Sequence, residues 1–353
     1  MVALLRTPAQ GGHESGRLAT QVELVAGKRG TAEGRASVDE TTAILALLLS
    51  PGVGFVSVQS ALAASRSART SLPALLTAPV RRRVSLLPPG AERAADALAR
   101  CTAHHMARAA KLLERARKAG IEAHTPESRA YPAPLIRFLG SSAPPLLFTL
   151  GRAALLAEDC AAVVGARRVS PRGKTFAAAC AGAFSAEGIP VVSGGARGVD
   201  TVAQDTAIAR HGNLVVALPQ GLLTYRPSRS VAKAVGQGAA VLVSEFPPDA
   251  PWETHAAVTR NAVISALARL VCVIEPRKTG GSIRTARIAL NQGKSVLVHV
   301  GWAAAARLDG LFAAGAMPLV PKGATFNAQR LLTVWRDAAA LTNHRVDLFE
   351  PRA

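Results

Sequence analysis

Three short segments combine glycine with basic or hydroxyl side chains, a combination that suits phosphate binding. Residues 165–168 read Gly-Ala-Arg-Arg, residues 193–198 read Ser-Gly-Gly-Ala-Arg-Gly, and residues 278–282 read Lys-Thr-Gly-Gly-Ser. Glycine lets an anion approach the main chain, and free amides at the start of a helix attract negative charge. Basic and hydroxyl side chains donate further hydrogen bonds to phosphate oxygens. The three segments therefore predict a phosphate-binding site.

Each segment taken alone has a second interpretation, because a glycine turn also permits tight packing between a strand and a helix. Three such turns at one edge of a sheet favour a ligand site over packing alone. The residues expected to contact phosphate are Gly165, Arg167, Ser193, Gly194, Gly195, Arg197, Gly198, Arg260, Lys278, Gly281 and Ser282.

Motifs for other ligands are absent from the sequence. It has no Gly-x-Gly-x-x-Gly fingerprint of a dinucleotide site and no Gly-x-x-x-x-Gly-Lys-Ser/Thr P-loop. Asp200 and Glu275 are the acids nearest the three segments, and we expect both to support the loops, with Asp200 capping a helix or orienting Arg197. No paired carboxylates and no Ser-His-Asp set can be placed from the sequence. We therefore expect a non-enzymatic protein without a cofactor or a metal site.

The three segments are positioned by alternating apolar and helical runs. The predicted strands are residues 161–164, 190–193, 214–218, 240–244, 271–275 and 295–300. The predicted helices are residues 173–187, 201–211, 230–236, 256–270 and 283–292. Repeated strand–helix units with nearly all-apolar strands are typical of a mostly parallel sheet with helices on both faces. The predicted fold is α/β and Rossmann-like, a class that binds ligands beyond the carboxyl ends of its strands.

A small helical domain is expected ahead of this sheet, at residues 39–125. Apolar helices at residues 41–50 and 56–64 flank a turn from Gly52 to Gly54, and a longer helix is expected at residues 91–119. A helix-hairpin-helix unit whose turn contacts DNA and a plain helical hairpin both fit the first two helices and their turn.

The remaining segments complete the expected organisation of the chain. Residues 1–38 lack a sustained period and are expected to form a flexible extension. The Rossmann-like domain is expected at residues 126–325, with a short strand near Leu319. Residues 326–353 are expected to be a helix and tail, without a winged-helix domain.

Composition points to a polyanionic partner. The chain carries 42 Lys and Arg against 23 Asp and Glu, a formal net charge of +19, which favours nucleic acid, although a solvated basic surface is the alternative. Aromatic residues make up 4% of the chain, so any stacking on bases would rest on very few side chains. The four cysteines have no metal-ligand spacing, and no apolar run reaches the ~18 residues that span a membrane. We expect a cytoplasmic protein with no membrane partner.

With these residues identified, the chain resembles the DNA-processing protein A family, also called DprA or Smf. Residues 163–167 (Val-Val-Gly-Ala-Arg) and 193–200 (Ser-Gly-Gly-Ala-Arg-Gly-Val-Asp) are similar to its two signature loops. Further matches occur in the family's order at Tyr131-Pro132, Gly221, Tyr225, Pro227, Ser244-Glu245, Arg260-Asn261, Glu275, Gly281-Ser282 and Thr285-Ala286. The resemblance covers about residues 41–325 and adds Asn261 to the expected contacts.

The resemblance implies a bacterial protein that binds and protects incoming single-stranded DNA during natural transformation. It also implies a homodimer formed through the Rossmann-like domain. The expected partners are a RecA-type recombinase, which such proteins help to load onto DNA, and the single-strand-binding protein that they displace. No catalytic step is implied.

Two departures from the family pattern bear on the strength of DNA binding. Ala262 stands where the family usually has a second arginine, and Gly280 stands where it usually has serine. The enzymatic alternative is a phosphoribohydrolase of the LOG type, but Arg287 occupies the position of the catalytic glutamate in that class. A nucleotide-binding protein on the same scaffold is the remaining alternative.

Overall fold

The computed structural model describes residues 39–277, 279–300, 308–320 and 325–338. The described residues form one compact unit. The extension expected at residues 1–38, Lys278, and the tail beyond residue 338 lie outside the described residues. Among the described helices, none combines the length and the apolar character needed to cross a membrane.

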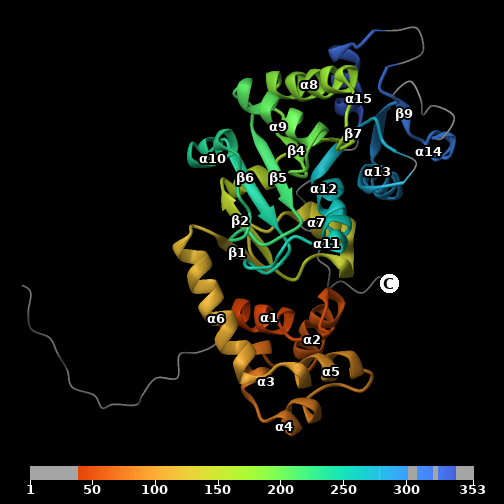
Figure 1. Cartoon of the computed structure of the whole chain (residues 1–353). Coiled ribbons are helices and arrows are strands. Elements are labelled where there is room, and N and C mark those ends of the chain that lie inside the picture. The colour runs from red at the N-terminus through yellow and green to blue at the C-terminus, as the bar shows by residue number, and fades with distance from the viewer. Residues whose placement is uncertain (1–38, 278, 301–307, 321–324, 339–353) are drawn as a thin grey trace, which may run out of the picture. The chain divides into compact units, whose positions relative to one another are not determined.

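A sheet of nine described strands forms the centre of this unit (Figure 1). Their order is β1-β2-β6-β5-β4-β3-β7-β8-β9. The strands are β1 (Glu122–His124), β2 (Leu147–Gly151), β3 (Cys160–Gly165), β4 (Val191–Ser193), β5 (Leu214–Leu218), β6 (Ala240–Ser244), β7 (Ala268–Ile274), β8 (Ser295–His299) and β9 (Met317–Pro318). The pairs β1–β2 and β2–β6 are antiparallel, and all other neighbours are parallel. The predicted α/β class with a mostly parallel sheet is confirmed.

All six predicted strands are present, and β5 and β6 have the predicted ends. The two antiparallel strands were not predicted. β1 has three residues, two of which are Glu122 and His124, and β2 comes soon after Pro144 and Pro145. Neither strand belongs to the regular alternation of apolar and helical runs. They extend the sheet beyond β6 by pairing Leu147 with His124 and Phe148 with Ser244.

Helices cover both faces of the sheet, and nearly every residue of the strands β3 to β8 is buried. One face packs against α8 (Pro171–Ala186), α9 (Val199–Ala209), α10 (Arg229–Gly236) and α15 (Ala328–Asp337). The other face packs against α7 (Ala133–Leu139), α12 (Asn261–Leu267), α13 (Gly281–Asn291) and α14 (Asp309–Ala313). Side chains of β3 alternate between the two cores, with Val163 in the first and Val164 in the second, as the two-residue period of a strand requires.

The helix predicted at residues 256–270 is instead two short helices and the start of a strand. α11 (Thr254–Thr259) ends at Arg260, α12 follows directly, and β7 begins at Ala268. The prediction was wrong because Ala266, Leu267, Ala268 and Leu270 are apolar residues that suit a buried helix and a buried strand equally. Periodicity alone does not separate the two. This break matters because it places Arg260 at a helix junction next to the glycine segments.

Six helices form the segment ahead of the sheet: α1 (Glu40–Leu48), α2 (Phe55–Ser67), α3 (Leu72–Thr77), α4 (Val80–Ser85), α5 (Glu92–Arg100) and α6 (Ala103–Lys118). The hairpin of α1 and α2 is as predicted. The helix predicted at residues 91–119 is divided at Cys101 and Thr102, because the Thr102 side chain caps α6 in a capping box with His105.

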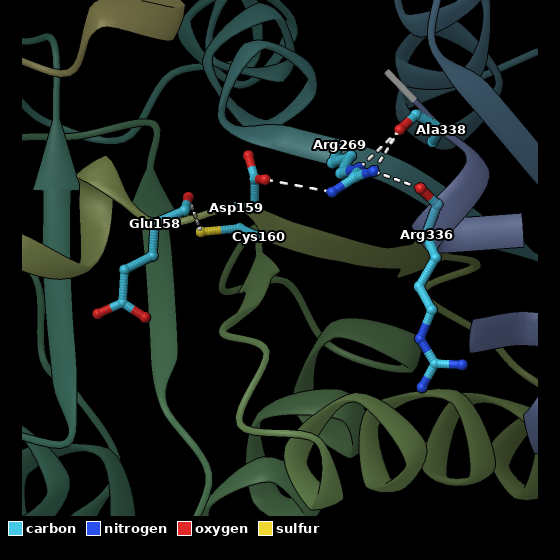
Figure 2. Close-up of polar contacts among 6 residues, drawn as sticks. All are labelled: Glu158, Asp159, Cys160, Arg269, Arg336 and Ala338. Carbon is cyan, nitrogen blue, oxygen red and sulfur yellow. Dashed lines mark hydrogen bonds and ion pairs between the residues drawn. The ribbon is translucent and has the colours of Figure 1, made fainter. Parts of the chain in front are cut away.

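The last described helix, α15, is fastened to the sheet by Arg269 at the start of β7 (Figure 2). The Nε atom of Arg269 donates to the carbonyl oxygen of Ala338 at 2.8 Å, and Nη1 lies 3.3 Å from the Asp159 carboxylate. Its Nη2 atom donates to the carbonyl oxygens of Arg336 and Ala338. One basic side chain thus satisfies carbonyl groups at the end of the helix, which have no partner within it.

Candidate DNA-binding edge of the sheet

The glycine segments meet where the strand order reverses. β3 lies between β4, which is the next strand along the chain, and β7, which is the fourth strand after β3. Gly165 at the end of β3 pairs with Ile274 at the end of β7. In open parallel sheets the connections leave such neighbouring strands in opposite directions, which opens a crevice beyond their carboxyl ends. The sequence therefore places the three segments around the switch point of the sheet.

Two adjoining cavities occupy this crevice. The larger, which we call the switch-point cavity, has a volume of about 680 Å³, and the smaller, which we call the loop cavity, has about 470 Å³. Five residues line both: Arg167, Arg168, Ala196, Ala257 and Arg260. The expected contact residues in the switch-point cavity are Gly165, Arg167, Arg260, Asn261, Gly281 and Ser282, and those in the loop cavity are Arg167, Gly194, Gly195, Arg197 and Arg260.

Exposed arginines surround the cavities without acidic partners. Arg167, Arg168, Arg197, Arg277 and Arg284 are all exposed and all line one cavity or both. No ion pair joins any of them to a carboxylate among the described residues. The positive charge of this edge is therefore available to an anion.

Three of these arginines were not among the expected contacts. Arg168 directly follows Arg167, and Arg277 precedes the third segment by one residue. Arg284 lies in the first turn of α13, three residues after Gly281, and a helical residue at that spacing returns to the same face. Their closeness to the glycine segments was the signal that could have found them.

Arg260 lies behind the glycine loop as well as at the cavity wall. It is 6% exposed, and its Nη1 atom donates to the carbonyl oxygens of Gly194 and Ala217. These bonds join the second glycine segment to the end of β5. The guanidinium thus holds the loop that carries Arg197, and it contributes positive charge to the wall of both cavities.

The Asp200 carboxylate supports the same loop. Its Oδ2 atom accepts hydrogen bonds from the amides of Gly194, at 3.1 Å, and Ala196, at 3.2 Å. Burial raises the pKa of Asp200 to about 6, while the charge of Arg260 and the amide bonds oppose that rise. The charged side chain beside Asp200 is Arg260. The two roles expected from the sequence were capping of a helix and orientation of Arg197.

Glu245 is a second carboxyl group beside Arg260. It is 3% exposed, and burial raises its pKa to about 8, opposed by the charge of Arg260. Its Oε1 atom has no hydrogen-bond partner within the described structure. A buried group in this state is held mainly in its protonated form at neutral pH.

Glu275 supports the first glycine segment from the end of β7. Its carboxylate accepts hydrogen bonds from the Ser170 amide, at 2.8 Å, and from the Ser170 hydroxyl. Ser170 in turn caps α8 by accepting from the amide of Gly173 at 3.0 Å. The loop from Gly165 to Ser170 is therefore tied at both ends to the sheet.

Two of the expected contact residues that the structure describes, Ser193 and Gly198, do not line the two cavities. Ser193 is fully buried, and its hydroxyl donates to the carbonyl oxygen of Val163 at 3.1 Å, so that hydroxyl joins two strands. Gly198 caps α9 beside the first segment, and Lys278 lies outside the described residues. Asn261 does line the switch-point cavity, and its amide nitrogen lies 3.3 Å from the Gly281 carbonyl oxygen.

Comparisons with known proteins match the part of the chain that forms the sheet. The model of the DNA recombination-mediator protein A family matches residues 122–330, which include all nine strands. Protein Smf of Escherichia coli K12 is 36% identical over 178 residues, which cover 50% of this chain and 47% of that protein. The chain spans about half the length of the curated relatives it matches.

Two solved structures share the fold. DNA processing protein A from Streptococcus pneumoniae aligns with a TM-score of 0.64 and 21% identity, covering 83% of this chain and 97% of that one. DNA processing protein A from Helicobacter pylori, whose structure describes a single-stranded DNA binding mode, aligns with a TM-score of 0.51 and 24% identity, covering 62% and 97%. Because the family model spans more than half of the sequence, this chain belongs to the DNA recombination-mediator protein A family.

Proposed function

We propose that this protein binds single-stranded DNA along the carboxyl edge of its sheet, with phosphates held by the glycine segments and the surrounding arginines. The observation that carries the proposal is the set of exposed, unpaired arginines around the two cavities. Contacts from amides and arginines to a phosphate backbone carry no sequence information. We therefore expect binding that tolerates any sequence and weakens with salt.

We propose binding without a chemical step. Asp200 is the one carboxylate among the described residues that line the cavities, and its Oδ2 atom already accepts two loop amides. A general base needs a lone pair directed at the substrate, and these amides occupy that oxygen. Arg287, at the position of the LOG-type glutamate, is exposed on α13 and lines neither cavity.

Family membership supports a wider role for the protein. We propose that the protein acts in the cytoplasm as a homodimer, protects incoming single-stranded DNA, and helps to load a RecA-type recombinase in place of single-strand-binding protein. Natural transformation or general recombination would supply the DNA. Support for this role comes from the family of recombination mediators to which the chain belongs.

A paired charge reversal tests the binding site. Arg167→Glu with Arg284→Glu should weaken binding of a fluorescent oligonucleotide by about 100-fold or more at low salt, since two phosphate contacts become repulsive. The matched control is Arg81→Glu with Arg82→Glu, two exposed arginines on α4 that make the same change in net charge. Fluorescence anisotropy reports both affinities. Equal losses in the two pairs, or no loss in the first, would show that DNA does not bind at this edge.

A further inference from the structure

The two cavities differ in the side chains that line them. Among described residues, no aromatic side chain lines the switch-point cavity. The loop cavity is lined by both Tyr225 and Trp252 in addition to its arginines. Because aromatic residues make up 4% of the sequence, two of them at one small cavity is a local concentration that the composition does not explain.

Trp252 is one of the few large apolar side chains that remain exposed. It lies between β6 and α11, and 47% of the residue is accessible to solvent. Trp252 also lines a second, more open hollow, together with Thr254, Val258 and Arg284. The indole ring therefore stands between the loop cavity and open surface, where a flat ligand could reach it.

A charged neighbour lies beside the ring. The guanidinium carbon of Arg167 is 5.9 Å from the centre of the indole ring, a distance at which a cation is attracted to an aromatic face. Arg167 also lines both cavities. One arginine thus connects the phosphate-binding edge with the aromatic surface, as the joined phosphate and base of a nucleotide would require.

Tyr225 lies at the same cavity as a half-buried ring with a polar end. Burial raises the pKa of its hydroxyl, so the group stays protonated at neutral pH and can donate a hydrogen bond. An apolar ring face, a hydroxyl donor and nearby cations match the chemistry of a nucleobase attached to its phosphate. A phosphate alone would need no aromatic surface.

We propose that Trp252 is a stacking platform for one unpaired base of a DNA strand whose phosphates lie on the neighbouring arginines. This inference rests on the proposed DNA-binding function and adds a specificity-determining residue to it. Bases in a duplex are already stacked on both faces, so they cannot offer a face to the indole ring. Trp252 therefore favours single strands over duplexes, whereas the arginines attract both.

The test compares ordinary oligonucleotides with abasic ones of the same length, which keep the phosphates and lack the bases. Trp252→Ala should weaken binding of the ordinary single strand about 5- to 150-fold, the range measured for loss of one stacked base. It should change binding of the abasic strand and of duplex DNA less than about twofold. Trp252→Phe, which keeps an aromatic face, should recover most of the affinity.

A tryptophan remote from the cavities provides the control. Trp335 on α15 packs against Arg269 with the guanidinium carbon 4.7 Å from the ring centre, and Trp335→Phe should leave all affinities unchanged. Unaltered binding of the ordinary strand by Trp252→Ala, or an equal loss on the abasic strand, would overturn the stacking role. Failure of the unmodified protein to bind either strand at low salt would instead overturn the proposed function itself.

Discussion

Arg83 in the helical segment and Arg260 at the carboxyl edge of the sheet are both buried, and each donates hydrogen bonds to main-chain carbonyl groups. Arg83 donates to the carbonyl oxygens of Leu76, Ala78, Leu98 and Cys101, which fastens α3, α4 and α5 together. Arg260 has two carboxyl groups beside it, and it lies beneath a glycine loop.

The difference shows that buried basic residues serve distinct purposes in one chain. Around Arg83 the carbonyl groups do not titrate, so its environment is purely structural. Around Arg260 the charges are balanced among a cation and two carboxyls that change protonation near neutral pH. A buried charge network of this kind fixes the geometry of a loop, and its contribution to the free energy of folding depends on pH.

The largest expected effect is a loss of stability that depends on pH when Arg260 is replaced, but not when Arg83 is replaced. Removing Arg260 with Arg260→Met leaves Asp200 and Glu245 buried without a cation, which should destabilise the protein by about 3 to 5 kcal/mol. Both carboxyls already have raised pKa values, about 6 and about 8, so the free energy of unfolding falls as the pH rises through them. Without Arg260 these pKa values rise further, and the loss should be greater at pH 8 than at pH 5.

Arg83→Met supplies the contrast to that substitution. The loss in the free energy of unfolding caused by Arg83→Met should be similar at pH 5 and pH 8, because the carbonyl groups left without donors do not titrate. Urea unfolding of the two variants and the unmodified protein at pH 5 and pH 8 measures both losses. A pH-independent loss for Arg260→Met would contradict the charge network.

The second prediction concerns Glu245 alone. Because folding raises the pKa of Glu245 from its ordinary value of 4.5 to about 8, the folded state holds this proton while the unfolded state has released it. The stabilisation is complete below pH 4.5 and is lost as the pH rises through 8. Between pH 6 and pH 9 the unmodified protein should lose about 2 to 3 kcal/mol more than Glu245→Gln. Identical pH profiles in chemical unfolding would show that this carboxyl does not carry the dependence.

The third prediction is a smaller loss of stability, and it compares a glycine turn at the edge of the sheet with one in the helical segment. Gly198 has a φ of 87°, and a Cβ atom there would lie 2.5 Å from the Arg167 carbonyl oxygen. Gly52 has a φ of 73°, but its nearest neighbour is the flexible end of Arg100 at 3.2 Å. Gly198→Ala should cost about 2 kcal/mol and Gly52→Ala about 1 kcal/mol. Thermal unfolding ranks the two, and the reverse order would count against rigid packing of the first and second segments.

The parallel part of the fold could be predicted because its strands and helices can be recognised from short stretches of the sequence. Strands such as Leu214–Leu218 and Ala240–Ser244 are short apolar runs between helical stretches, and that alternation has few other solutions. β1 and β2 could not be predicted, because their three and five residues gain their structure from pairing with β6 and each other. Such pairing between distant segments is not visible in a local window.

The candidate site could be predicted as a place but not as a set of contacts. The glycine segments mark the loops, and Arg167 and Arg197 are exposed there as expected. The sequence does not distinguish Arg260, whose guanidinium is buried, from Arg284, which is exposed, because each is an arginine near the start of a helix with a polar residue next to it. Likewise Ser193 looks like a phosphate ligand until the sheet places its hydroxyl against Val163. Tertiary packing decides which polar groups remain available.

The salt dependence of DNA binding tests the central claim most directly. Each phosphate contact on a single strand contributes about 0.7 to the slope of log affinity against log salt concentration. Arg167→Ala with Arg197→Ala should therefore reduce the slope by about 1.4, while Arg81→Ala with Arg82→Ala should leave it unchanged. That result is what the account predicts for phosphates held at the carboxyl edge of the sheet. The same slope in the unmodified protein and in the Arg167 and Arg197 pair would contradict it.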